Sequence, residues 1–365
     1  MQNFNGQIIY YRVFDIAAEI DTNLARELLS KQSVAEHFKL RRSSREMVIE
    51  QAPVVMNLGT FDQTINHRDF PILGQAKLWS FGAVSISFRL ELSQSISIQE
   101  LKSLAASIEM ENSLHEHALE IVKKLIHQLG SCLTNQGVWD QYEDYLIYNM
   151  DPHQIKGDIK SILDQEEFYQ LIFTEEVDQL SEGQKNLIRQ SSIQYGKNDL
   201  IVIDWNSAFI CSQGDSQDVA DVIEFALCQL LELRYYDELL DRKLSSLYKS
   251  IQNKEPSLLS NQYNKFSHEA AVVYIEISDI VEKIQNSLKV IGDFYYARIF
   301  RLSVEKFRCS DWQKSVDSKL NNLAEVSRLF HSQVNERRNQ LLEIIIIVLI
   351  AVELIPFIQG LMAKF

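Results

Sequence analysis

A nearly uninterrupted apolar stretch, Ile344 to Ala363, constrains this chain more than any other feature of its sequence. About twenty helical residues span about 30 Å, the thickness of the hydrocarbon core of a bilayer. Glu353 interrupts the stretch and opposes insertion by roughly 2.5–3.5 kcal/mol, and Pro356 follows it. Because the many isoleucine, leucine and valine side chains outweigh one carboxyl group, the pattern predicts a C-terminal transmembrane helix. The alternative is a helix buried in the core of a soluble protein.

The residues that flank this stretch predict its orientation. Arg337 and Arg338 precede it, whereas Lys364 is the basic residue that follows it. The positive-inside rule therefore favours a single-pass protein whose body lies in the cytoplasm, at a bacterial inner membrane, or on the matrix side in an organelle. Met1 to Tyr11 shows neither the features of a secretion signal nor those of a mitochondrial presequence, so we expect neither. Glu343 and Glu353 are the predicted charged residues of the membrane segment.

Charge and motifs narrow the possible functions. The sequence has 36 basic and 50 acidic residues, a net charge of -14, which disfavours direct binding of nucleic acid. Its four cysteines lie far apart and match no zinc motif, as expected for reduced thiols inside a cell. The sequence contains no GxxxxGK[ST], GxGxxG or GxSxG motif. We therefore predict no bound cofactor.

The first part of the chain mixes strand and helix patterns. The clearest strand is Val84 to Leu90, where apolar and polar residues alternate, so that one face packs and the other is solvated or paired. In chain order we expect strands over 7–19, 47–56, 84–90 and 142–150, and helices over 23–31 and about 101–125, the second broken near Asn112 and Ser113. This βαββαβ order is that of a ferredoxin-like α+β head. Helices over 154–169 and 174–190 and a strand over 200–210 are expected to extend it.

After Asp215 the pattern predicts long helices over 218–251, over 259–301 and from about 310 into the apolar stretch. The third carries a heptad seam of Val316, Leu320, Leu323, Phe330, Val334 and Leu341, with Ser327 and Arg337 as polar members. We expect one continuous helix of about 50 residues or two closely coupled segments. The predicted domains are an α/β head over 1–212, a helical hairpin and stalk over 213–340, and an anchor over 341–365.

Three blocks of this sequence are similar to those of a known family. They are Phe81-Gly82-Ala83-Val84, then Glu232-Leu233-Arg234-Tyr235-Tyr236-Asp237 with Leu240-Asp241, and Leu342-Glu343-Ile344-Ile345-Ile346 with Glu353. Their order and spacing, from about residue 45 onward, resemble the "required for meiotic nuclear division" family, a domain of unknown function. A tryptophan that often follows the glutamate at the anchor is Ile344 here. The resemblance implies a membrane-associated protein with a C-terminal hydrophobic helix and no established catalytic activity.

The second block supplies the candidate assembly residues Glu232, Arg234, Tyr235, Tyr236, Asp237 and Asp241. On a helix, Arg234 shares a face with Asp237 and Asp241, and Glu232 lies on another edge with Tyr236. One hypothesis is a charged patch that binds a partner helix or stabilises an oligomer. The favoured alternative is a set of intrahelical ion pairs that clamp two helices, because exposed pairs of this kind are common and individually weak.

Other polar groups are weaker candidates. Asp140, Glu143, Asp144 and Asp204 could bind magnesium, although solvated strand ends explain them more simply. His115 and His117 are two residues apart and point to different helical faces, which makes a poor metal pair. Aromatic and basic residues alternate over 294–301, where core packing is favoured over binding of nucleic acid.

Together these features predict a noncatalytic membrane-anchored scaffold or assembly factor. It would act through an unidentified protein partner or as a homo-oligomer, because symmetric neighbours could satisfy the heptad seam and Glu353. One alternative is an oligomeric ion-conducting or ion-sensing membrane protein. A third is a metal-dependent enzyme that uses the acidic cluster.

Overall fold

The computed structural model describes residues 3–30, 35–37, 52–66, 68–92, 94–154, 158–173, 180–194, 196, 198–212, 216–252, 262–286 and 294–362. The chain has an α+β architecture, as the sequence predicts. It divides into two compact units, unit 1 with Met1–Tyr235 and Ile280–Gln313, and unit 2 with Tyr236–Asp279 and Lys314–Phe365. Unit 1 contains the sheet, and unit 2 contains only helices among its described residues.

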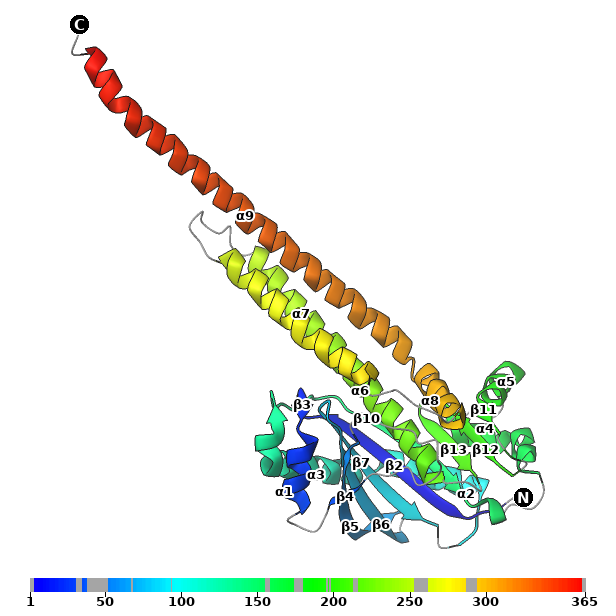
Figure 1. Ribbon diagram of the computed structural model, residues 1–365. Coiled ribbons are helices and arrows are strands. Elements are labelled where there is room, and N and C mark those ends of the chain that lie inside the picture. The colour runs from blue at the N-terminus through cyan, green and yellow to red at the C-terminus, as the bar shows by residue number, and fades with distance from the viewer. Residues whose placement is uncertain are drawn as a thin grey trace. The chain divides into compact units, whose positions relative to one another are not determined.

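A nine-stranded sheet forms the centre of unit 1 (Figure 1). From one edge to the other its strands are β11 (Ser192–Ile193), β12 (Leu200–Ile203), β13 (Ser207–Cys211), β10 (Glu143–Met150), β2 (Gly6–Asp15), β7 (Ala83–Glu91), β6 (Arg68–Leu78), β5 (Val54–Ile65) and β4 (Ala35–His37). β10 and β13 are parallel, and every other neighbouring pair is antiparallel. Two small ladders join β1 (Asn3–Phe4) to β8 (Ile96–Ser97) and β3 (Glu19–Ile20) to β9 (Leu133–Thr134).

Several strand predictions differ from the structure. The expected strands at 7–19, 84–90 and 142–150 correspond to β2, β7 and β10. β5 begins at Val54 rather than at Met47, and residues 47–51 lie outside the described part. β6 is absent from the prediction. The single strand expected over 200–210 is a hairpin, in which the Asp204 N–H donates to the Ser207 carbonyl across the turn between β12 and β13.

The helices of the first part match the prediction up to residue 129 and only in part after it. They are α1 (Thr22–Ser30), α2 (Ile98–Met110), α3 (Asn112–Leu129), α4 (Glu166–Phe173) and α5 (Glu182–Gln190). Short 3-10 turns occur at Gly130–Cys132, Pro152–Gln154 and Ile159–Asp164. The predicted helices over 154–169 and 174–190 correspond in part to these last elements, while 155–157 and 174–179 lie outside the described ranges. Glu111 separates α2 from α3 with an extended backbone, and its carboxylate accepts from the Ser113 N–H. The break expected near Asn112 is confirmed.

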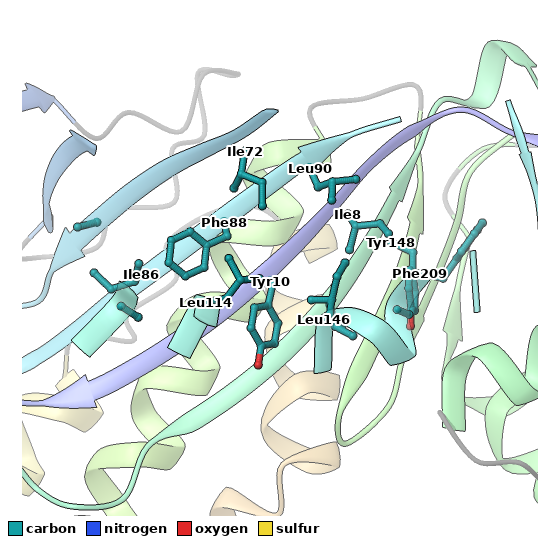
Figure 2. Close-up of a cluster of buried hydrophobic side chains, with 14 of the residues drawn as sticks. Ile8, Tyr10, Ile72, Ile86, Phe88, Leu90, Leu114, Leu146, Tyr148 and Phe209 are labelled. Carbon is teal, nitrogen blue, oxygen red and sulfur yellow. The ribbon is translucent and has the colours of Figure 1, made fainter. Parts of the chain in front are cut away.

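One face of the sheet is apolar and packs beneath helices (Figure 2). Because side chains alternate along a strand, the cross-strand register puts Tyr10, Ile86 and Leu146 on the same face. Leu101, Ile108 and Leu114 from α2 and α3 belong to the same buried core. The ten side chains labelled in Figure 2 lie in this cluster. This face holds the main hydrophobic core of unit 1.

The opposite face, here called the polar face, carries Lys77 of β6 and Ser85 and Ser87 of β7, and the first half of α6 (Ser216–Gln252) covers it. Phe225 of α6 packs on Trp79, with ring centroids 5.1 Å apart. α8 (Phe294–Lys306) lies on the same side, where Phe300 contacts Phe225 at 6.0 Å. The alternation over Val84–Leu90 left open whether the second face of this strand is solvated or paired. The structure shows that it is paired, because a helix from later in the chain covers it.

Unit 2 is formed by helices. It contains the second half of α6, most of α7 (Gln262–Asn286) and α9 (Cys309–Met362) from Lys314 onward. The Ser267 hydroxyl donates to the Ser327 carbonyl at 3.4 Å, and Phe266 packs on Phe330 at 5.7 Å. α9 has 54 residues, so the expected long apolar C-terminal helix is confirmed. The helix expected over 259–301 is represented by α7 and α8, and residues 287–293 lie outside the described part.

Candidate functional site

The polar face of the sheet holds a buried cation, Lys77 of β6. Its Nζ lies 2.8 Å from Asp221 Oδ1 and 2.6 Å from Glu224 Oε2, both on α6. The side chains of Lys77 and Glu224 are only 4% and 1% exposed. Burial lowers the pKa of Lys77, but the two carboxylates raise it more, so the ammonium group stays charged. These ion pairs attach α6 to the sheet.

Neighbouring groups complete the hydrogen bonds of Glu224. The Ser85 hydroxyl on β7 donates to Glu224 Oε1, and Trp79 Nε1 donates to Ser85 Oγ at 3.3 Å. Burial raises the pKa of Glu224, while the charge of Lys77 lowers it. The network specifies the position of α6, because a shifted helix would leave these buried groups without partners.

A second buried acidic group lies two turns further along α6. Glu232 is 0% exposed and faces Asp15 of β2, which is 2% exposed. Burial raises the pKa of both carboxyl groups. No hydrogen-bond donor reaches Asp15 Oδ2 or either Glu232 oxygen among the described residues. This pair therefore differs from Glu224, which a lysine neutralises.

Arg234 forms a third polar contact between α6 and the sheet. It pairs with Glu143 Oε1 of β10, and its guanidinium lies 5.9 Å from the Trp139 ring centroid and 5.8 Å from that of Trp312. Burial raises the pKa of Glu143 to about 7, although Arg234 opposes that rise. Two aromatic rings and a carboxylate of unit 1 thus contact this cation, whose side chain remains 32% exposed.

The predicted acidic cluster is not a joint metal site. Glu143 and Asp144 are adjacent on β10 and point to opposite faces; Asp144 pairs with Arg12 at 3.0 Å. Asp204 pairs with Lys306 of α8 at 3.4 Å, and Asp140 is exposed. Across the described ranges, no three histidine, cysteine or acidic side chains gather closely enough to hold a metal ion. Cations of the fold neutralise three of these four carboxylates.

The residues of the second sequence block are divided among different environments. Glu232 and Tyr236 are buried, so their side chains are not available on the surface for a partner. Tyr235 contacts the Trp139 ring at 5.7 Å. Within unit 2, Asp237 and Asp241 of α6 both pair with Lys319 of α9, at 2.8 and 2.6 Å. The expected pairing of Arg234 with these aspartates is wrong, because cations and anions from other elements are their partners.

Sequence reasoning missed the residues that matter most on this face, namely Lys77, Ser85, Asp15, Asp221 and Glu224. The polar positions of the Val84–Leu90 alternation were the available signal, since Ser85 is one of them. A lysine near the end of an unrecognised strand gave no such signal. His115 and His117 contact aromatic rings, those of Tyr142 at 4.5 Å and Phe61 at 4.6 Å.

The strands that carry this polar face match a known family. A family model described as "Uncharacterized protein MJ0711, N-terminal domain" covers residues 5–217, more than half of the chain. The chain belongs to this family. A protein of Methanocaldococcus jannaschii described as "Uncharacterized protein MJ0711" is 26% identical over 259 residues, which is 70% of this chain and 74% of that protein.

The MJ0711 N-terminal domain family region contains every strand of the large sheet. It supplies Asp15, Lys77, Ser85 and Glu143, whereas Glu224, Glu232 and Arg234 of α6 lie beyond its end. The polar contacts described above therefore join the family region to the helix that follows it.

Proposed function

We propose that this protein is a noncatalytic, membrane-anchored scaffold or assembly factor. The observation that carries the proposal is the apolar part of α9. Among the described residues, this is the one helix long and apolar enough to cross a membrane, with a mean hydropathy of 2.0 over its best 18-residue window, and none of that window is buried inside the protein. Its large side chains are about half exposed, from Ile344 at 47% to Leu349 at 62%.

The free energy of transferring the exposed apolar side chains of α9 from water into a bilayer favours insertion. Eleven leucine, isoleucine and valine side chains between Leu342 and Ile355 are exposed. Removing such a side chain from water stabilises by roughly 1.5–3 kcal/mol, so the segment gains on the order of 10 kcal/mol or more from hydrocarbon. Glu353 opposes insertion by roughly 2.5–3.5 kcal/mol, which is smaller. Arg337 and Arg338 support a cytoplasmic location of the preceding residues.

The proposed scaffold role has structural support in the acidic residues. Glu143, Asp144 and Asp204 each pair with a cation of the fold, which favours a structural role over acid–base or metal chemistry. The strand order β10-β2-β7-β6, with α1 and the α2–α3 pair between strands, supports a ferredoxin-like head. We also propose that the chain is a member of the "required for meiotic nuclear division" family. Homo-oligomers would let Glu353 of one copy meet polar groups of another.

Alkaline carbonate extraction of cell membranes tests the anchor. The full chain should stay in the membrane pellet, and a variant with Ile347→Lys and Leu349→Lys should move to the supernatant, because two lysines at the centre add roughly 5–7 kcal/mol against insertion. A matched control places two lysines at exposed polar positions of α9, Asn321→Lys and Asn322→Lys, and should stay in the pellet. Release of the unaltered chain into the supernatant would refute the anchor and the function built on it.

A further inference from the structure

The carboxyl groups of Asp15 and Glu232 form a close, buried pair that the proposed anchor does not use. Asp15 ends β2, and Glu232 projects from the face of α6 that covers the sheet. The side chains are close enough for a hydrogen bond between them. Neither carboxyl group forms an ion pair with a lysine, arginine or histidine in the described ranges. Two carboxylates in such a place cannot both carry a charge without a large desolvation penalty.

The other charged groups on this face already have partners. From α6, Arg234 pairs with Glu143 of β10, and Cys228 is a buried thiol near Glu232. From β6, Lys77 pairs with Asp221 and Glu224. At the C-terminal end of β2, the Trp139 N–H donates to the Asp15 carbonyl and not to its carboxyl group. No described neighbour supplies the positive charge that a doubly ionised pair requires.

We propose that Asp15 and Glu232 form a proton-binding site, in which one proton shared by the two carboxyl groups holds α6 on the sheet at neutral pH. One of the two carboxyl groups keeps its proton and donates it to the other, so the pair carries one negative charge and one hydrogen bond. Loss of the proton to water leaves two facing carboxylates and breaks the contact between β2 and α6.

The site makes the attachment of α6 depend on pH. Both pKa values are raised in the folded protein, so the folded state holds a proton that the unfolded chain releases above about pH 4. Stability from the pair is therefore complete in acid and declines as pH rises toward the folded pKa. The unfolding equilibrium constant should increase up to tenfold per pH unit over that range. This inference concerns unit 1 and is independent of the membrane anchor.

Infrared spectroscopy of the full chain in detergent tests the proposal directly. A protonated carboxyl group has a C=O stretching band that a carboxylate lacks. The spectrum at pH 7 minus that of Glu232→Gln should contain this band, and the band should shift on transfer to D2O. Asp15→Asn should change its frequency, because the acceptor of the hydrogen bond changes. Glu343→Gln, on the exposed surface of α9, is the matched control and should leave the band unchanged.

Three results would overturn the proposal. The first is a difference spectrum without the band at pH 7, which would show that both groups are ionised. The second is loss of the band on addition of magnesium or calcium, which would make the pair a cation site. The third is a folded Glu232→Gln protein in which α6 keeps the wild-type pH dependence of amide hydrogen exchange. If Glu232→Gln fails to fold, the frequency shift in Asp15→Asn decides in the same way, and no shift refutes the shared proton.

Discussion

Replacing Lys77 with methionine should release α6 from the sheet more strongly than any other single removal of a cation in unit 1. The substitution keeps the length and apolar stem of the side chain, but it removes the charge that neutralises Asp221 and Glu224. Their side chains are only 10% and 1% exposed, so water cannot replace the ammonium group. Breaking a buried ion pair from one side costs roughly 3–5 kcal/mol.

Amide hydrogen exchange of the full chain in detergent, read by mass spectrometry at pH 7, measures this loss in β6 and α6. Since every 1.4 kcal/mol is a factor of ten, exchange in these elements should accelerate by roughly 10²–10³-fold. Lys185→Met is the matched control, because Lys185 pairs with Glu166 and Glu182 near the surface, and it should change exchange much less.

A double variant separates electrostatics from packing. Lys77→Met with Glu224→Gln removes the more deeply buried of the two uncompensated charges, and glutamine can still accept from the Ser85 hydroxyl. The double variant should therefore be more stable than Lys77→Met alone, with a coupling of about 2 kcal/mol or more. Additive losses, or an acceleration below about fivefold in Lys77→Met, would show that the buried charges do not hold α6.

Two further predictions concern Gly82, which lies between β6 and β7, and Glu143 of β10. Gly82→Ala should destabilise unit 1 by about 3 kcal/mol or more, because Gly82 has a φ of 107° and a Cβ there would lie 1.8 Å from the Ala17 carbonyl oxygen. The control in thermal unfolding is Gly137→Ala, where a Cβ meets nothing within 4 Å. Equal melting temperatures of the two variants would contradict the reasoning. Glu143→Gln should flatten the pH dependence of hydrogen exchange in β10. The pKa of Glu143 is raised to about 7, so its stabilising contribution to the folded state is complete below about pH 4.5 and is lost as pH rises to 7. An unchanged pH dependence of hydrogen exchange between pH 5 and 7 in Glu143→Gln would exclude this role.

The sequence was most informative where local periodicity and local packing agree. The alternation of Val84 to Leu90 matches the faces of β7, because Val84, Ile86, Phe88 and Leu90 all belong to the apolar core. Helical spacing gave α6 and α9 nearly to their ends. In β7 and α6 one side of the pattern is buried, so the period identifies them, whereas the continuous apolar stretch identifies the C-terminal part of α9.

β6 could not be recognised in the same way. Pro71, Gly74 and Lys77 are all unfavourable in a central strand. Pro71 is tolerated because β6 pairs with β7 only from Ile72 onward, so its nitrogen has no donor role toward that strand. Lys77 is tolerated because Asp221 and Glu224, 144 and 147 residues later, supply the opposite charge. Only the tertiary structure contains that information.

The same limit explains the second sequence block. Helical geometry correctly puts Arg234 and Asp237 three residues apart on one helix, but it cannot show that Glu143 and Lys319 offer them partners. A charged side chain on a long helix pairs with whichever opposite charge the fold brings closest. The helix that carries the candidate residues was therefore predicted, whereas the ion-pair partners of Arg234 and Asp237 were not.

The position of α6 has a practical consequence for how this family is delimited. The MJ0711 N-terminal domain family region ends at residue 217, while the helix that covers the polar side of the sheet begins at Ser216. A fragment cut at that boundary would expose Lys77 and Asp15 to solvent together with buried rings such as Tyr11 and Trp79. The smallest piece suited to expression, crystallisation or binding assays therefore reaches at least to Tyr235 and includes the α8 segment, whatever boundary the alignment suggests.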